Sequence, residues 1–187
     1  MFIYEKRHQF PINVKRTDVR LAKALYAQLG GQNGELGACL RYFAQSFTMP
    51  DERGRRLLKD IATEEMGHVE MICTLIYLLT KDATVKEMKE AGNDCSFAIF
   101  GDGIGLHDCA GVPFTTAGIS ITGDYKADLT EDLAAEERAR ATYERLIDLT
   151  DDLEVINVLL FLRQREIVHY NRFKSLLDVY NKENKMK

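Results

Sequence analysis

An internal repeat of ionisable residues constrains this chain of 187 residues more than any other feature. Each half carries a glutamate and, 30 residues later, a Glu-x-x-His motif, and a shift of 101 residues superimposes the two halves. The repeated residues are Glu35, Glu65, His68, Glu136, Glu166 and His169. Residues i and i+3 share one face of a helix, so each Glu-x-x-His pair can present two ligands to one point.

Apolar residues recur at helical spacing around the repeated positions, on the same faces. Gly30 and Gly31 interrupt the first stretch, and Pro50 opens the second, with Asp51 and Glu52 in its first turn. The pattern predicts an all-α fold with two long helices, a long connection and two more. That order is typical of a ferritin-like four-helix bundle with one long Gly-rich crossover between helices 2 and 3.

The predicted organisation is a single ferritin-like domain over residues 1–187. It comprises an extended N-terminal arm (1–16), a first helix pair (17–80), a crossover (81–127) and a second helix pair (128–181). A short helix is expected near residues 84–91. Seven of the 13 glycines fall within residues 92–127, which are expected to be irregular.

Composition excludes several other classes of protein. Apolar residues make up 45% of the chain and the net charge is −4, which argues against a nucleic-acid partner. No apolar run is long enough to cross a membrane, and the first residues lack the pattern of a signal peptide. None of the four cysteines forms a Cys-x-x-Cys pair, so a thiolate metal site is not expected.

Four carboxylates and two imidazoles form the ligand set of di-iron and di-manganese bundles. These oxygen and nitrogen donors suit manganese or iron. The alternative is a set of surface acids with two core histidines. It is disfavoured because charged side chains on apolar faces are buried only when paired or metal-bound. Glu5-x-x-His8 has the same form outside the helical pattern and is interpreted as a chance match.

Three further residues lie close to the motifs. Tyr42 and Tyr143 each follow a lone glutamate by seven residues, and each hydroxyl is predicted to reach back to that glutamate and orient it. The alternative is a core tyrosine. Gly67 lies inside a predicted helix, where it costs about 1 kcal/mol against alanine, and is interpreted as making space beside a metal.

The sequence resembles the manganese catalases, most closely the spore-coat branch of that family. The resemblance covers nearly the whole chain. It rests on residues 30–31, 34–36, 62–71, 123–124, 128–129, 134–136 and 161–169, and for the spore-coat branch on Tyr4-Glu5-Lys6 and residues 110–115. One departure is Ala135, where some members carry an arginine.

The resemblance implies two manganese ions per chain, with iron as the alternative metal. Glu35 and His68 would bind one ion, Glu136 and His169 the other, and Glu65 would bridge them. Glu166 would act as a proton-transfer base, whereas the symmetry of the repeat makes it a ligand like Glu65, and both interpretations stay open. Glu166 and Tyr42 are the candidate catalytic residues.

The predicted function is that of a manganese catalase, which converts hydrogen peroxide to water and oxygen. Two alternatives are a structural spore-coat component with a little-used metal site and a di-iron oxidase or peroxidase of the rubrerythrin or ferritin type. By resemblance, the chain is expected to form a homo-oligomer, a hexamer, and to meet other spore-coat proteins. It is expected in the cytoplasm or the spore coat, without secretion through a signal peptide.

Overall fold

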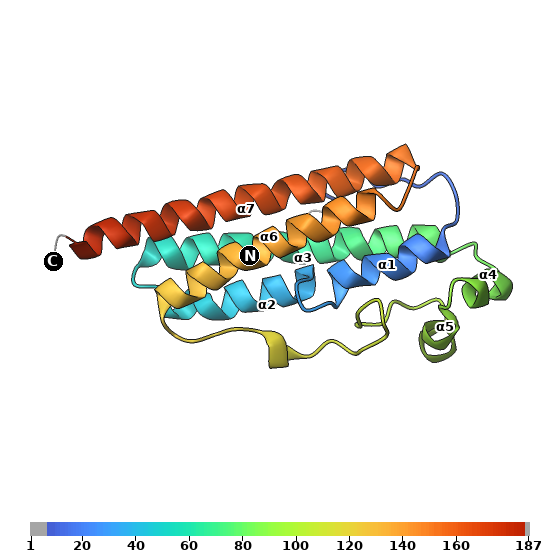
Figure 1. Ribbon diagram of the computed structural model, residues 1–187, viewed down its shortest axis with the longest axis horizontal. Helices are drawn as coiled ribbons and strands as arrows, with labels where there is room; N and C mark the ends of the chain where they lie inside the picture. Colours follow the sequence, from blue (N-terminus) through green and yellow to red (C-terminus); the bar gives the residue numbers. More distant parts are fainter. Residues whose placement is uncertain (1–6, 186–187) are drawn as a thin grey trace.

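The computed structural model describes residues 7–185, which form helices and no strand. The bundle is built from α1 (Val19–Leu29), α2 (Glu35–Gln45), α3 (Glu52–Thr80), α6 (Tyr125–Ile147) and α7 (Leu153–Lys185). α1 and α2 follow one another along one side, α3 returns beside them, and α6 and α7 form the second pair (Figure 1). The all-α prediction is confirmed.

The break between α1 and α2 falls at the predicted glycines. α1 ends at Leu29 with Gly30 as its C-terminal cap, and α2 begins at Glu35. A Cβ at Gly30 would lie 2.4 Å from the backbone oxygen of His107, so only glycine allows the crossover to approach here. A 3₁₀ turn, η1 (Ser46–Thr48), separates α2 from α3.

Aspartates begin the main helices, as their side chains favour. Asp18 accepts from the amide of Leu21, and Asp51 from the amide of Gly54, while Asp124 accepts from two amides at the start of α6. These caps set where α1, α3 and α6 start, and they therefore fix the register of the residues that point inward.

The apolar core is split into two clusters along the bundle. One includes Leu25, Leu75 and Leu159, and the other includes Leu58, Ile61 and Phe173. The repeated glutamates and histidines are buried but belong to neither cluster. A polar centre therefore occupies the interior beside two apolar cores.

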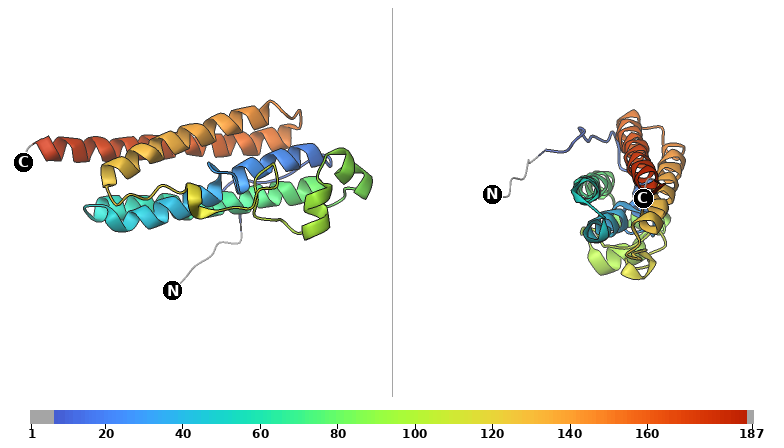
Figure 2. Two further views of the ribbon diagram at one scale, coloured as in Figure 1. Left: turned by 60° about the horizontal axis from the view of Figure 1, so that its bottom comes forward. Right: turned by 90° about the vertical axis from the view of Figure 1, so that its left-hand side faces the viewer.

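The segment between α3 and α6 carries α4 (Val85–Glu90), α5 (Asp94–Phe100) and a 3₁₀ turn, η2 (Thr116–Gly118). α4 lies where a short helix was expected, but α5 was not expected. Its seven residues lie next to a glycine-rich stretch, which made the whole segment look irregular. Gly101, at φ 59°, caps the helix. The rest of the segment returns along α1 and α2 to the start of α6 (Figures 1 and 2).

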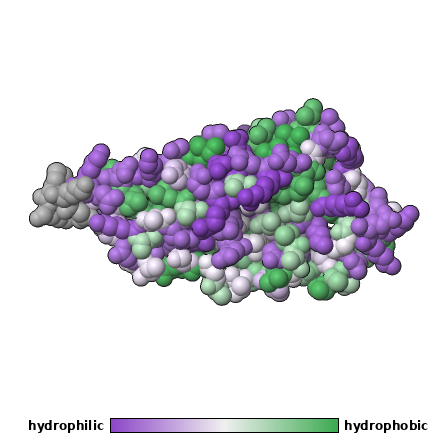
Figure 3. All heavy atoms as spheres, in the orientation of Figure 1, coloured by the Kyte–Doolittle hydropathy of each residue, from purple (hydrophilic) through white to green (hydrophobic). Residues whose placement is uncertain are grey.

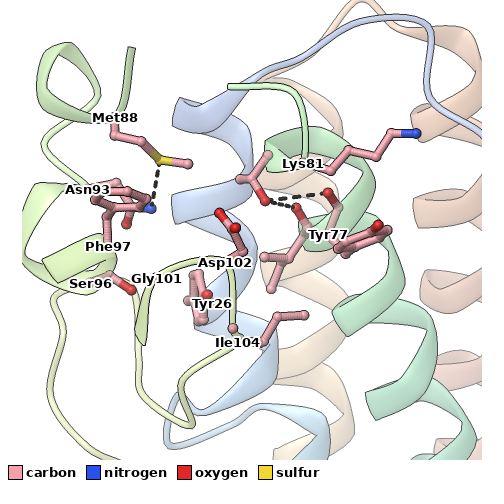
Figure 4. Close-up of a pocket in the computed structure, with 13 residues that line it drawn as sticks. Tyr26, Tyr77, Lys81, Met88, Asn93, Ser96, Phe97, Gly101, Asp102 and Ile104 are labelled. Carbon is pink, nitrogen blue, oxygen red and sulfur yellow. Dashed lines mark hydrogen bonds between the residues drawn. The ribbon is translucent and has the colours of Figure 1, made fainter. Parts of the chain in front are cut away.

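His107 anchors this segment. Its ring stacks on Tyr26 with centroids 4.1 Å apart, and its Nε2 atom lies 3.1 Å from the hydroxyl of Ser96. Figure 4 shows the neighbouring cavity of about 240 Å³, lined by Tyr26, Ser96 and Asp102 among others. None of the repeated glutamates and histidines lines this cavity, so it is separate from the polar centre.

Residues 7–16, part of the expected arm, contain no helix. The Lys15 amide donates to Asp152 over 2.7 Å, and Phe10 stacks on Phe161 with ring centroids 5.1 Å apart. The arm is therefore held against α7 and the turn before it. Tyr4-Glu5-Lys6, cited above for the resemblance, lies outside the described residues.

The surface combines charged helix faces with apolar patches. Leu149 and Leu153 are more than 60% exposed at the turn between α6 and α7, where Figure 3 shows apolar surface. Leu40, Phe43 and Phe47 form an outward row on α2 and η1 and are between 38% and 63% exposed. No helix in the described range is both long and apolar enough to cross a membrane.

Candidate metal centre

Four helices bring the six repeated residues together in the interior. Glu35 comes from α2, Glu65 and His68 from α3, Glu136 from α6, and Glu166 and His169 from α7. Each is at most 2% exposed. The convergence follows from the repeat, because a helix pair packed against its copy directs equivalent residues to the same axis.

Glu65 lies at the middle of this cluster. Its Oε2 atom is 2.7 Å from Nδ1 of His68, and its Oε1 atom is 2.8 Å from Nδ1 of His169. A further carboxylate approaches the Nδ1 atom of each histidine: Glu35 is 3.7 Å from Nδ1 of His68, and Glu136 is 3.8 Å from Nδ1 of His169. The cluster thus consists of two nearly equivalent halves on either side of Glu65.

The ligand atoms fall into two groups in which all atoms lie within 4.8 Å of one another. The first group is Glu35, Glu65, His68 and Glu166, and the second is Glu65, Glu136, Glu166 and His169. Glu166 therefore belongs to both groups, as Glu65 does. This position suits a ligand shared by two metals and also a base beside them.

Burial and mutual repulsion raise the pKa of three of these carboxyl groups. The pKa of Glu35 rises to about 7 and that of Glu136 to about 8, in each case through burial first and then through the charge of Glu65. The pKa of Glu166 rises well above its usual value through burial and the charge of Glu35. Without metal, these three carboxyl groups therefore hold protons more readily than exposed glutamates do.

At the two histidines and Glu65, attraction between opposite charges outweighs burial, so these groups favour their charged forms. Burial disfavours the charged imidazoles, but the Glu65 carboxylate outweighs it and raises the pKa of His68 to about 10 and of His169 to about 11. Burial likewise opposes the charge of Glu65, yet both histidines hold the pKa of Glu65 far below normal. Without metal, the histidines therefore favour the protonated form, whose positive charge stabilises the Glu65 carboxylate.

The residues present fit a pair of divalent cations. Buried atoms without an aligned hydrogen bond include one oxygen each of Glu65 and Glu166, both oxygens of Glu136 and both ring nitrogens of His169. Such atoms are costly unless a water or an ion satisfies them. Four carboxylates at −1 each would balance two ions at +2 each, and the oxygen and nitrogen donors suit manganese or iron.

The two tyrosines were predicted at the centre with the wrong partners. The Tyr143 hydroxyl on α6 donates to Glu35 on α2, and Tyr42 on α2 interacts with Glu136 on α6, whose pKa it helps to lower. Each tyrosine thus serves the carboxylate of the opposite half. Seven residues rise about 10.5 Å along a helix, which is too far for a phenol to reach back to its own glutamate.

The interpretation of Gly67 is also wrong. A Cβ there would meet only the side-chain nitrogen of Gln9 in the arm, at 3.9 Å. The glycine therefore faces the arm rather than the cluster. Ala135 is 4% exposed, so the position where some family members carry arginine is buried in this chain.

Glu64, which pairs with Arg165, was not predicted as part of the site. Glu64 lies 3.8 Å from Nε2 of His68 and 3.2 Å from Nε2 of His169. Arg165 contacts both oxygens of Glu64, at 2.6 and 3.3 Å. Burial opposes the charge of Glu64, but hydrogen bonds from His169 and Arg165 lower its pKa to about 2. The two residues are 101 positions apart, and that repeat spacing was the available signal.

A second missed group lies beside Glu136. Asp128 and Asp132 precede it at intervals of four residues on α6, and both are fully buried. Arg41 and Gln45 on α2 are buried with them, and Gln45 donates to the backbone oxygen of Ser120 over 3.0 Å. The spacing of the acids could have indicated this polar row, which runs from the cluster to the crossover.

The fold and the cluster define a class: helical bundles whose inward carboxylates and histidines are suited to metal ions. The family model described as manganese containing catalase matches residues 1–187. The crystal structure of wild-type KatB, a manganese catalase from Anabaena, matches with a TM-score of 0.88 at 37% identity, over 97% of this chain and 82% of KatB. The ferritin-like fold prediction is confirmed.

Two curated relatives match nearly the whole chain. Protein CotJC of Bacillus subtilis (strain 168) is 48% identical over 183 residues, which cover 98% of this chain and 96% of that protein. A probable manganese catalase of Clostridium acetobutylicum is 35% identical over 185 residues, covering 98% and 82%. The chain belongs to the manganese-containing catalase family.

Proposed function

We propose that the protein is a manganese catalase that converts two molecules of hydrogen peroxide into two of water and one of oxygen. The observation that carries the proposal is the place of Glu65, whose two oxygens contact Nδ1 of His68 and His169 at nearly equal distances. A carboxylate shared between two equivalent halves suits two adjacent metal ions. Membership of the family supports the same activity.

Two manganese ions per chain would be held by these residues. Glu35 and His68 would bind one ion, Glu136 and His169 the other, and Glu65 both. Bound manganese would supply two one-electron redox centres, enough for the two-electron chemistry of peroxide. Iron suits the same donors, so the proposal includes the statement that the cell loads manganese.

The chain's own residues would move the protons. Oxidation of one peroxide to oxygen releases two protons, and reduction of the other to two waters consumes two. Glu166 suits this transfer because it is buried, has a free oxygen atom and has a raised pKa. Tyr42 would orient Glu136, with which it interacts.

A structural role in a spore coat is the second candidate. It is supported by the resemblance of residues 110–115 to the spore-coat branch of the family, and the chain is 48% identical to Protein CotJC, against 35% to the probable manganese catalase. Under this proposal the protein lies in the spore coat, contacts other coat proteins and uses its metals little. If it is instead a catalase, it acts in the cytoplasm.

In either place the exposed row of Leu40, Phe43 and Phe47 suits contact between copies in a homo-oligomer, for which we propose a hexamer.

The test measures oxygen release from hydrogen peroxide and bound metal in protein expressed with manganese. We expect about two manganese ions per chain and rapid oxygen release. Glu65→Gln should lose both, whereas Glu137→Gln, at an exposed salt bridge with Arg140, should keep both. Bound manganese without oxygen release would contradict the catalase proposal and favour the structural role.

A separate experiment distinguishes the structural role from catalysis. Wild-type protein and the Glu65→Gln variant are sedimented with coat proteins from spores. Equal sedimentation, combined with bound manganese but no oxygen release in the wild type, would support a structural component. Peroxide consumption that needs an added reductant and iron would support the di-iron peroxidase instead.

A further inference from the structure

Glu64 faces the outer nitrogens of both histidines in the cluster. The Nδ1 atoms of His68 and His169 point to Glu65, so their Nε2 atoms point away from it. Among the described residues, Glu64 is the one carboxylate within 4.0 Å of either Nε2 atom, at 3.8 and 3.2 Å. The His169 contact is within hydrogen-bonding distance and the His68 contact is longer than a hydrogen bond, and neither Nε2 atom has an aligned hydrogen bond to any other described residue.

One side chain can face both histidines because their rings lie almost parallel. The ring centroids are 5.8 Å apart and the planes differ by 23°. Both rings are fully buried, while the Glu64 side chain is 15% exposed. Glu64 therefore stands at the edge of the cluster and closes it from one side.

Arg165 holds the Glu64 carboxylate in place. Its Nε atom lies 2.6 Å from Oε1 and a terminal nitrogen lies 3.3 Å from Oε2, a two-point contact that restrains rotation of the carboxylate. Because Arg165 comes from α7 and Glu64 from α3, the pair also links the two helices that carry the histidines.

We propose that Glu64, held by Arg165, is a positioning residue for both histidine ligands. It would accept a hydrogen bond from the Nε2–H group of each imidazole when metal is bound, and so keep Nδ1 free and aimed at the metals. A carboxylate in this position fixes the tautomer of a ligating histidine and makes it a stronger donor. This inference rests on the proposed function, in which His68 and His169 bind manganese.

The experiment measures manganese affinity and the electron paramagnetic resonance spectrum of bound Mn(II) in Glu64→Gln. The amide is neutral and offers one acceptor oxygen, so it cannot serve both imidazoles. We expect manganese affinity to fall roughly 10–100-fold and the spectrum to change. Glu144→Gln is the matched control, because it breaks contacts with Arg163 and Arg140 without touching the cluster.

Arg165→Gln provides a second variant that leaves Glu64 in place. Its manganese affinity should fall by a smaller factor than in Glu64→Gln. Because Arg165 acts through Glu64, adding Arg165→Gln to Glu64→Gln should reduce the affinity little further. Should Glu64→Gln not fold, a wild-type affinity and spectrum in Arg165→Gln would overturn the role of the pair.

The outcomes separate the inference from the proposed function. Wild-type protein that binds two manganese ions, together with an unchanged affinity and spectrum in Glu64→Gln, would overturn the inference alone. Wild-type protein that binds no manganese would overturn the proposed function. A loss of affinity in Glu64→Gln that exceeds the loss in Glu144→Gln would support the positioning role.

Discussion

The hydroxyl of Tyr143 donates a hydrogen bond to Glu35, which belongs to the other helix pair. Tyr42 and Glu136 interact across the bundle in the opposite direction. Each half of the cluster is therefore completed by a side chain from the other half. This exchange ties α2 to α6 at the level of the glutamates.

Tyr143→Phe should weaken the half of the cluster that contains Glu35. Removing the hydroxyl leaves a fully buried carboxyl oxygen without its donor, which costs about 1–3 kcal/mol of stability. We expect a lower urea midpoint and weaker manganese binding. Tyr77→Phe, at a half-exposed tyrosine on α3, is the control and should change neither. Equal behaviour of the two variants would show that the contact contributes nothing.

Glu166→Gln distinguishes the base from the ligand. A base outside the metals can be replaced by an amide without loss of metal, but it can no longer carry a proton. If Glu166 is the base, we expect the variant to keep most of its manganese and to lose most of its oxygen release. Metal analysis and an oxygen electrode on the same sample measure both. A parallel loss of metal and activity would identify Glu166 as a ligand.

Metal-free protein should become less stable as pH rises from 6.5 to 9. The pKa values of Glu136, His68 and His169 are raised to about 8, 10 and 11 in the folded chain, so the native state keeps protons that the unfolded chain releases. Stability falls with pH wherever the native state binds more protons. Urea unfolding of chelator-treated protein at both pH values measures the difference.

Manganese should reverse this trend. Its ligands must lose their protons, so binding tightens and releases protons as pH rises. The gain in urea midpoint on adding manganese should therefore be larger at pH 9 than at pH 6.5. Metal-free stability that is flat or rising over this range would contradict the raised pKa values.

Gly67→Ala should stabilise the protein. The position is helical, and an added methyl group would meet only Gln9, at 3.9 Å. Alanine reduces the freedom of the unfolded chain, which is worth about 0.4–1 kcal/mol at a compatible site. Gly30→Ala is the opposing control, because its Cβ would clash with the backbone of His107 at 2.4 Å. A lower denaturation midpoint in Gly67→Ala would show that the glycine has another role.

The repeat made the bundle and its polar centre predictable from sequence. Each glutamate is followed after 30 residues by Glu-x-x-His, and this pattern repeats after 101 residues. Both spacings can be read from the sequence without any knowledge of the tertiary structure. Helical periodicity determines which residues share a face, and four acids on apolar faces require a partner. The break between α1 and α2 was also predictable, because Gly30 and Gly31 interrupt the helical pattern there.

Only the tertiary structure decided which side chains meet across the bundle. The pairs Tyr143–Glu35 and Glu64–Arg165 join residues more than 100 positions apart, and their contacts depend on how α2, α3, α6 and α7 pack. The burial of Asp128, Asp132 and Arg41 likewise depends on neighbouring helices. Periodicity gives the direction of a side chain from its own helix, whereas its partner depends on the distance and rotation of the next one.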